Sequence, residues 1–362
     1  MQNAASVSNP FAASAAEEMP NHEAVLDFLR SAAVRAALPG SPQQVETIET
    51  HMSWVFLVGD HVLKLKKPVR YPFLDFSTPA AREACCREEV RLNSRLAPGV
   101  YLGLMALQWQ SGRLALLPES ALADRSGVVD WLVWMTRLPA EHMLDRAIAD
   151  ARVQLAEIDA LVAVLAAFYR TATLAACDPD EARLHFQREQ AVNREVLLRP
   201  QFRIDGAVAA LDRLDLALEH HRAELHRRAA GGHIVDGHGD LRPEHVCLLP
   251  VPVVIDCLEF NPRLRQVDPF DELAFLALEC GMAGAAWIGP RLIDGCSAAL
   301  GDRPPPAVLQ IYSASRALLR ARLSLAHLLD PQPRTPQRWV PQAQRYVVCA
   351  LEALDALASL AR

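Results

Sequence analysis

The period of the apolar positions changes along the chain. Residues 45–66, VETIETHMSWVFLVGDHVLKLK, alternate apolar and polar side chains, which is the period of a half-buried β-strand. The Gly59-Asp60 pair between the two apolar runs predicts a hairpin turn, because both residue types tolerate the backbone angles of a short turn. Three more strand-like runs follow at 101–110, 113–118 and 128–136. The first part of the chain is therefore expected to contain about five strands.

Two helices are expected in the same part of the chain. Asn21 is a suitable N-cap for a helix whose apolar residues, including Val25 and Leu29, fall on one face. Thr78 and Pro79 combine a polar cap with a first-turn proline, and the helix they open is expected to run until Pro98-Gly99. The segment 21–137 thus predicts a small β-rich lobe with one main helix.

Helical periodicity dominates from residue 138 onward. Candidate helices cover 153–171, 181–197, 206–229, 268–285, 306–328 and 337–359. They are interrupted by one β-like segment, residues 233–260, which is rich in polar motifs. We expect an α+β chain with a disordered tail at 1–20, a lobe at 21–137 and a larger, mostly helical lobe at 138–362. Function is expected in the polar segment, because loops on a rigid scaffold carry most chemistry.

Composition narrows the classes of protein. With 51% hydrophobic and 22% charged residues the chain has globular composition, and a net charge of −6 gives no reason to expect nucleic acid as a partner. The eight cysteines contain no C-x-x-C pair, which favours buried thiols in a reducing cytoplasm over a metal ribbon or disulfide scaffold. No apolar run approaches the roughly twenty residues that span a membrane. Composition gives no prediction of oligomeric state.

The segment 238–245, HGDLRPEH, holds the candidate chemistry. Asp240 on a loop can accept a proton from an attacking hydroxyl, and His245, five residues later, can ligate a metal on nucleotide phosphates. Asp256 ends the apolar run VPVVID, and its carboxylate suits a second metal contact. Arg242 is expected either to grip the transferred phosphate or to pair with Glu244.

Two further groups belong to this prediction. Glu259 follows Asp256 closely and can add an oxygen ligand. In the first lobe, a strand lysine paired with a helix glutamate can hold ATP phosphates, and Lys64 with Glu89 fits this pattern. Lys66 is a near alternative, because it shares the strand face of Lys64.

These motifs resemble the aminoglycoside phosphotransferase family, which has a bilobal protein-kinase-like fold and a loop written H-G-D-L-x-x-x-N. The block SWVFLVGDHVLKLKKP, with its continuation to YLGL, is similar to an uncharacterised bacterial branch of that family. The resemblance implies ATP and a divalent metal, Mg²⁺ or Mn²⁺, as cofactors and a small molecule as acceptor. It also implies roles for nine positions: Asp240 as base, Asp256 and His245 at the metal, Lys64 and Glu89 at the phosphates, and Trp134, Met135, Thr136 and Arg137 beside adenine.

Two departures from the family pattern leave alternatives open. The chain has no G-x-G-x-x-G, and position 245 is His instead of Asn. We consider three states: transfer with a metal preference shifted from Mg²⁺ and lost below about pH 6.5, transfer with one metal held mainly by Asp256, or nucleotide binding without turnover. A pseudokinase that acts as an interaction module is thus one competing class. A metallohydrolase built from His238, Asp240, His245 and Asp256 is another.

Overall fold

The computed structural model describes residues 19–40, 44–71, 74–175 and 178–360. The chain divides into two compact units. The first consists of residues 1–87 and 102–137, and the second of residues 88–101 and 138–362. Residues 88–101, which the sequence analysis placed in the first lobe, thus group with the helical unit. Most of the expected tail at 1–20 lies outside the described residues.

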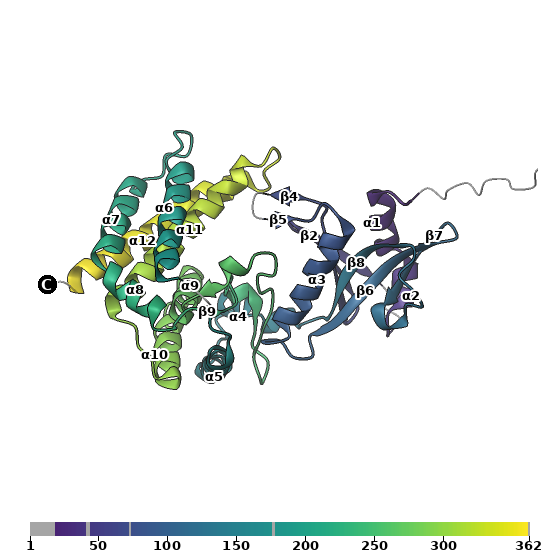
Figure 1. Ribbon diagram of the computed structural model, residues 1–362, viewed down its shortest axis with the longest axis horizontal. Coiled ribbons are helices and arrows are strands. Elements are labelled where there is room, and N and C mark those ends of the chain that lie inside the picture. The colour runs from purple at the N-terminus through teal and green to yellow at the C-terminus, as the bar shows by residue number, and fades with distance from the viewer. Residues whose placement is uncertain (1–18, 41–43, 72–73, 176–177, 361–362) are drawn as a thin grey trace, which may run out of the picture. The chain divides into compact units, whose positions relative to one another are not determined.

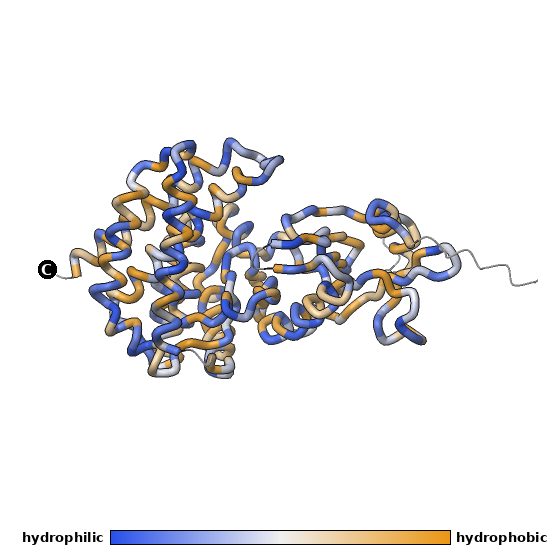
Figure 2. Tube along the Cα trace, turned by 45° about the horizontal axis from the view of Figure 1, so that its top comes forward, coloured by the Kyte–Doolittle hydropathy of each residue, from blue (hydrophilic) through white to orange (hydrophobic). Residues whose placement is uncertain are grey.

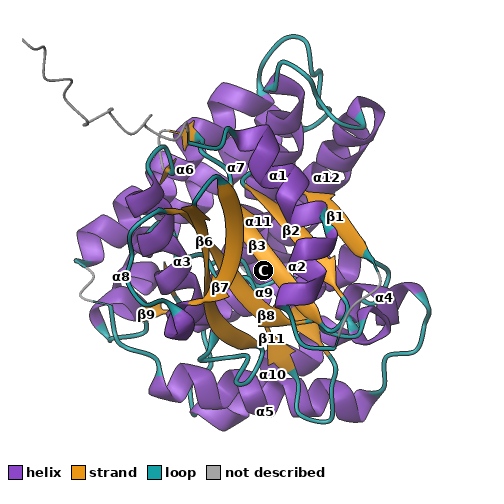
Figure 3. Cartoon of the chain, turned by 90° about the vertical axis from the view of Figure 1, so that its right-hand side faces the viewer, coloured by secondary structure: helices purple, strands orange, loops and turns teal. Residues whose placement is uncertain are grey.

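The first unit is built on a six-stranded sheet in the order β1-β2-β3-β8-β6-β7 (Figure 3). Its strands are β1 (Val45–Glu49), β2 (Ser53–Val58), β3 (His61–Lys66), β6 (Tyr101–Gln110), β7 (Arg113–Pro118) and β8 (Val128–Thr136). The predicted hairpin is confirmed, since β2 and β3 pair antiparallel across Gly59-Asp60. All five predicted strands are present, and β1 adds a sixth. A two-stranded ribbon of β4 (Arg70–Tyr71) and β5 (Leu74–Asp75) follows.

Two short helices cover one face of this sheet. Helix α1 (His22–Arg30) begins as predicted, because the Asn21 side chain accepts the backbone N–H of Ala24 at 2.9 Å. Helix α2 is Ala32–Ala37. Val25 and Leu29 pack with Leu63 and Leu65 of β3 in one apolar cluster. Burial of these leucines turns the intervening lysines of β3 to the opposite face of the sheet.

Helix α3 (Pro79–Asn93) links the two units in sequence (Figure 1). It starts as predicted, with the Thr78 hydroxyl accepting the N–H of Ala81 at 3.2 Å. Its first turns are tied to β8 by Arg82, whose guanidinium is 3.0 and 2.8 Å from the two carboxylate oxygens of Asp130. The bidentate geometry fixes the angle at which this part of the helix crosses the strand.

The second unit is mostly helical (Figures 1 and 2). Apolar and polar residues alternate along its helices in Figure 2, as expected for amphipathic elements. The predicted helices are present, although 206–229 divides at His221 into two, and α4 and α10 were not among the predicted helices. The helices are α4 (Leu144–Ala149), α5 (Leu155–Thr171), α6 (Pro179–Leu197), α7 (Ala207–His220), α8 (Arg222–Ala230), α9 (Pro269–Met282), α10 (Ile288–Leu300), α11 (Pro306–Ala326) and α12 (Trp339–Leu360).

Two small sheets interrupt these helices and carry the polar segment. Strand β9 (Val235–Asp236) pairs with β12 (Gln266–Val267), and β10 (Val246–Cys247) pairs with β11 (Val253–Val254). The loop 237–245 runs between β9 and β10, and Asp256 lies just after β11. Short 3₁₀ turns complete the chain: η1 (Glu119–Ala121), η2 (Ala140–His142), η3 (Pro243–His245), η4 (Pro262–Leu264), η5 (His327–Leu329) and η6 (Pro336–Arg338).

The apolar side chains of β9, β10 and β11 anchor the polar segment in the core of the second unit. Val235, Val246 and Val254 belong to one buried cluster with residues of α4, α5, α9 and α10. Six of the seven described cysteines are buried, and Cys349 is partly exposed. Among the described residues, no helix has the length and apolar character needed to span a bilayer.

Candidate active site

The loop 237–245 is fixed by one buried carboxylate, that of Glu272 in the first turn of α9. Glu272 is 0% exposed and accepts the backbone N–H groups of His238, at 2.9 Å, and Gly239. The Tyr169 hydroxyl donates a third hydrogen bond at 2.9 Å. Burial raises the pKa of Glu272, and these three donors act in the opposite direction. Residue 237 is glycine because a Cβ there would lie 2.7 Å from the Glu272 carboxylate.

His238 braces the loop from inside. Its Nε2–H donates to the carbonyl of Ile255 at 2.9 Å, and its Nδ1 accepts the N–H of Asp240 at 3.2 Å. Acceptance by Nδ1 requires the neutral ring. Burial, with a smaller contribution from His245, lowers the pKa of His238 to about 4. The histidine therefore joins the loop to the chain just before Asp256.

The base candidate, Asp240, has a side chain that is 25% exposed. Arg242 Nη2 lies 2.9 Å from its Oδ2. Burial would raise the pKa of Asp240, but the positive charge of Arg242 and its hydrogen bond to the carboxylate act in the opposite direction, and the pKa falls below its ordinary value. Asp240 is thus an ionised carboxylate at neutral pH, as a proton acceptor must be.

Arg242 contacts three side chains of the same loop. Besides Asp240, it donates to the Glu244 carboxylate and, through Nη2, to His245 Nε2 at 3.3 Å. The ion pair with Glu244 was one of the two predicted arrangements. A contact with the transferred phosphate stays a prediction.

The 3₁₀ turn η3 directs His245 toward Asp256. The Nδ1–H of His245 donates to the Asp240 carbonyl at 2.8 Å, which leaves the lone pair on Nε2. Nε2 lies 3.5 Å from Asp256 Oδ2. An imidazole lone pair beside a carboxylate is a donor set that fits a divalent ion of the Mn²⁺ type. Among the described residues no group of three or more such side chains is arranged to hold a metal, so an ion here would complete its shell with nucleotide oxygens and water.

The backbone of Asp256 is in the left-handed region, with φ 63°. Aspartate tolerates this region better than most residues, and a non-glycine residue there often belongs to a functional site. The segment is fastened on both sides: the Asp256 N–H donates to the Tyr101 hydroxyl at 3.3 Å, and the Cys257 N–H to Asn93 Oδ1 at 2.8 Å. Glu259 is half-buried three residues further on, and its role as a ligand stays a prediction.

The structure distinguishes the two candidate clamp lysines by burial. Lys66 is 1% exposed, with its Nζ 5.5 Å from the centre of the Phe76 ring, whereas Lys64 is half-buried. Both lie on the sheet face opposite Leu63 and Leu65. In α3, Glu89 is 0% exposed.

Glu88 has partners within its own unit, since Arg91 is 2.7 Å and Arg265 3.3 Å from its carboxylate. These partners support the choice of Glu89 over Glu88 as the clamp glutamate. Lys64 belongs to the first unit and Glu89 to the second, so their pairing stays a prediction.

The predicted adenine segment forms the end of β8. Trp134 Nε1–H donates to His61 Nδ1 at 3.2 Å, and Met135 and Thr136 stand opposite β3. The N–H of Arg137 donates to the Asp60 carbonyl at 2.7 Å. A contact with adenine would therefore use other backbone groups of this segment, and such a contact stays a prediction.

Sequence reasoning did not single out three residues that hold the site together. Arg95 donates to the carbonyls of Asp236 and Gly237, both at 2.9 Å, at the entrance to the loop. Asn93 and Tyr101 fasten the segment around Asp256. All three lie in the stretch from the end of α3 to the start of β6, and they are 141 to 164 residues upstream of their partners. The polar Asn93 at the end of an otherwise packed helix was the one available signal.

Ion pairs join α9 to α11. Arg316 binds Asp271 through two contacts of 2.7 Å, and Arg320 binds Glu279 at 2.8 Å. The positive charges of both arginines also act on Asp240. The network thus adds to the field that keeps the base ionised.

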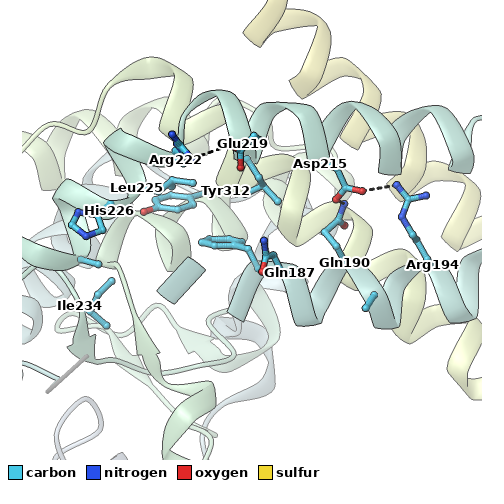
Figure 4. A pocket seen from close by; sticks show the side chains of 14 residues that line it. Gln187, Gln190, Arg194, Asp215, Glu219, Arg222, Leu225, His226, Ile234 and Tyr312 are labelled. Carbon is cyan, nitrogen blue, oxygen red and sulfur yellow. Dashed lines mark hydrogen bonds and ion pairs between the residues drawn. The ribbon is translucent and has the colours of Figure 1, made fainter. Parts of the chain in front are cut away.

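A separate cavity of about 470 Å³ lies between α6, α7, α8 and α11 (Figure 4). Its walls are apolar at Leu225, Ile234 and Tyr312, and charged side chains such as Arg194 and Asp215 stand along one side. None of the predicted site residues lines it.

Comparisons with known sequences give distant relatives. No protein-family model matches the chain. Uncharacterised proteins of Mycobacterium bovis and Mycobacterium tuberculosis are each 29% identical over 326 residues, which cover 86% of this chain and 60% of theirs. The chain thus spans about three fifths of the length of these relatives.

Comparisons with solved structures identify the fold. A choline/ethanolamine kinase family protein from Mesorhizobium loti superposes with a TM-score of 0.52 at 16% identity, covering 92% of this chain and 98% of that one. A choline kinase from Cryptosporidium parvum gives 0.54 at 11% identity, covering 94% and 97%. These similarities show the fold: the chain has the α+β protein-kinase-like fold, with a β-rich and a helical unit, which confirms the predicted class. A closer relation to the aminoglycoside phosphotransferases stays a prediction.

Proposed function

We propose that this protein transfers the γ-phosphate of ATP to a hydroxyl group of a small molecule. One observation carries the proposal: an ionised Asp240 lies in the same loop as His245, whose Nε2 is 3.5 Å from Asp256 Oδ2. A base and a metal-binding pair, in the order loop, hairpin and strand end, are the parts that phosphoryl transfer requires. The shared fold with choline kinases supports this assignment by analogy.

Asp240 acts on the acceptor. Its Oδ2 is held by Arg242, whereas its Oδ1 has no hydrogen-bond partner among the described residues. Oδ1 is therefore available to accept the hydrogen bond of an acceptor hydroxyl and to take its proton as the new bond forms. Arg242 holds the carboxylate in position and, on release from Glu244, would offer a guanidinium edge to the transferred phosphate.

His245 Nε2 and Asp256, with Glu259 as a third candidate, would hold the divalent ion. When bound, that ion neutralises charge on the phosphates. Lys64 or Lys66, positioned by Glu89, would bind the phosphates from the β-rich unit, and residues 134–137 would contact adenine. Since an imidazole replaces an oxygen ligand, we propose that Mn²⁺ supports transfer better than Mg²⁺.

Single-turnover ATP consumption in Mg²⁺ and in Mn²⁺ tests the proposal. We expect the native protein to favour Mn²⁺ and His245→Asn to shift the preference toward Mg²⁺. The exposed His220→Asn serves as a matched control and should keep the native preference. Equal behaviour of the native protein and His245→Asn in both metals would show that residue 245 is not a ligand.

One observation favours a second candidate function, nucleotide binding without turnover. Arg242 Nη2 contacts Asp240 and His245 Nε2 together, at 2.9 and 3.3 Å, and so occupies both the base and the metal ligand. If these contacts persist with nucleotide bound, the protein binds ATP and does not consume it. Calorimetric ATP binding combined with no ATP consumption by the native protein, and recovery of consumption in Arg242→Met, would support this candidate over the first.

A further inference from the structure

A pocket of about 460 Å³ adjoins the loop that carries Asp240. The loop contributes Pro243 and Glu244 to its wall, and α4 contributes Asp145. Further lining residues come from η6 and α12, among them Arg338 and Arg345, and α9 contributes Glu279. The volume is in the range of small-molecule sites. Nothing in the predicted site accounts for this pocket.

Two residues that line the pocket, Glu279 and Tyr346, are connected to the surroundings of Asp240 through Arg320. Tyr346 is 1% exposed, and its hydroxyl donates to the Glu279 carboxylate at 2.9 Å. The same carboxylate accepts Arg320 Nε at 2.8 Å, and the charge of Arg320 acts on Asp240. The lining of the pocket is thus connected to an arginine whose charge acts on the base.

One wall presents carboxylates. Asp145 is half-buried in the first turn of α4, and its carboxylate has neither a hydrogen bond nor an ion pair among the described residues. Glu244 is bound by Arg242 through a single oxygen, with its side chain 41% exposed. These two groups offer places for a cation next to the loop that bears the base.

The part of the lining that comes from η6 and α12 presents guanidinium groups. Arg338 Nε donates to Gln342 Oε1 at 3.1 Å, and Arg345 Nη2 donates to the Met282 carbonyl at 2.9 Å. Neither arginine forms an ion pair within the part of the chain that the structure describes. Their remaining N–H groups are available to an anion, for which the planar guanidinium is well suited.

We infer that this pocket binds the acceptor and that the acceptor is a small hydroxylated zwitterion. Its ammonium group would bind Asp145 and Glu244, and its carboxylate would bind Arg338 and Arg345. A neutral molecule would leave Asp145 and both arginines without charged partners, and a purely cationic one would leave the arginines so. The inference rests on the proposed function for the reaction, but the pocket's charge pattern alone carries the choice of ligand.

The reaction on such a ligand is a simple transfer. The hydroxyl oxygen forms a bond to the γ-phosphorus as the bond from that phosphorus to the bridging oxygen of ADP breaks. The hydroxyl proton passes to Asp240, and ADP leaves with the electron pair of the broken bond. No oxidant or reductant takes part.

Binding to the full-length protein is the first test. Calorimetry would compare L-homoserine and the dipeptide seryl-glycine with matched analogues that lack one charge: the C-terminal amides, which lack the anion, and the desamino hydroxy acids, which lack the cation. We expect each zwitterion to bind at least about tenfold more tightly than its two analogues. Equal binding of the three forms, or no binding of any zwitterion, would overturn the inference.

Substitutions assign each wall to a charge. Asp145→Asn should weaken the zwitterions and the amides about tenfold and leave the hydroxy acids unchanged. The double variant Arg338→Gln with Arg345→Gln should weaken the zwitterions and the hydroxy acids and leave the amides unchanged. Arg291→Gln, on the exposed surface of α10, is the control and should change none. Uniform effects on all three ligand forms would contradict the assignment.

A phosphate-transfer assay distinguishes failure of the inference from failure of the proposed function on which it rests. If zwitterions bind with this pattern and no labelled phosphate is transferred to them from ATP, the proposed function fails and the pocket assignment stands. If transfer occurs to neutral sugars or diols with a lower KM than to zwitterions, the function stands and the inference fails. ATP affinity should be equal in the native protein, in both pocket variants and in the Arg291→Gln control.

Discussion

His245 Nε2 lies 3.5 Å from Asp256 Oδ2, although His245 precedes β10, Asp256 follows β11 and ten residues separate them. Two hydrogen bonds and one backbone conformation support this approach. His245 Nδ1–H is fixed on the Asp240 carbonyl, the Ile255 N–H donates to the His245 carbonyl at 2.9 Å, and Asp256 adopts a left-handed backbone. The proximity is thus built into the hairpin and does not depend on a bound ion.

Substitutions at Asp256 can distinguish the effect of its charge on turnover from the effect of its left-handed backbone on stability. We expect Asp256→Asn to fold with a stability within about 0.5 kcal/mol of the native protein, because Asn tolerates this region. Asp256→Ala should lose a further 1 kcal/mol or so from strain. Both should lose ATP turnover. Urea unfolding monitored by circular dichroism measures the first effect, and full turnover by Asp256→Asn would exclude the carboxylate as a ligand.

Gly239 should tolerate no side chain. Its φ is +89°, and a Cβ would lie 3.0 Å from the Leu264 carbonyl oxygen and from Leu258. Gly284 is the matched control, since its φ is +100° and nothing lies within 4 Å of an added Cβ. Gly239→Ala should therefore destabilise the protein by about 1–3 kcal/mol more than Gly284→Ala does. Equal destabilisation in thermal or urea unfolding would mean that the loop is looser than the structure shows.

The three hydrogen bonds to Glu272 are expected to contribute measurably to stability. In Glu272→Gln the amide NH₂ cannot accept the N–H groups that the carboxylate accepts, so at least one buried donor loses its partner. We expect a loss of about 1–3 kcal/mol at pH 8 and reduced turnover, because the loop bearing Asp240 loses its support. Asp294→Asn, in an exposed pair with Arg303, should change stability by less than about 0.5 kcal/mol. A neutral effect of Glu272→Gln would contradict the bracing role.

His238 predicts a specific pH dependence of stability. Its pKa in the folded protein is about 4, below the ordinary value of 6.5, so the unfolded chain binds its proton first as the pH falls. The contribution of His238 is complete above pH 6.5 and is lost between pH 6.5 and 4, for a total of about 3 kcal/mol. His238→Gln should show a shallower decline over this range than the native protein or the exposed control His220→Gln. Identical slopes would mean that the ring is not buried in its neutral form.

The sequence was most informative where local chemistry decides the structure. Gly59-Asp60 fixed the hairpin, and Asn21 and Thr78 marked helix starts through their own hydrogen bonds. It failed at α10, because Gly289 and Pro290 resemble a breaker. Proline is tolerated in a first turn, where its missing N–H would have no intrahelical partner.

The site residues fall into the same two groups: those that local spacing predicts and those that depend on contacts distant in the sequence. The spacing of Asp240, His245 and Asp256 is local, and it was sufficient to predict that they gather around one hairpin. The preference between Lys64 and Lys66 depends on burial, which alternation alone cannot rank when both side chains lie on one face. Asn93, Arg95 and Tyr101 reach the loop from a distant part of the sequence, and no pattern in a single sequence encodes that distance.

The central claim, that Asp240 directs phosphate from ATP to a small-molecule hydroxyl, has one most direct measurement. The protein is incubated with γ-labelled ATP, Mn²⁺ and the hydroxylated panel described above together with sugars and amino alcohols, and labelled phosphate esters are quantified. We predict labelled ester with the native protein and a decrease on the order of 100-fold or more with Asp240→Asn, at unchanged ATP affinity. Equal labelling by Asp240→Asn and the native protein would contradict the account.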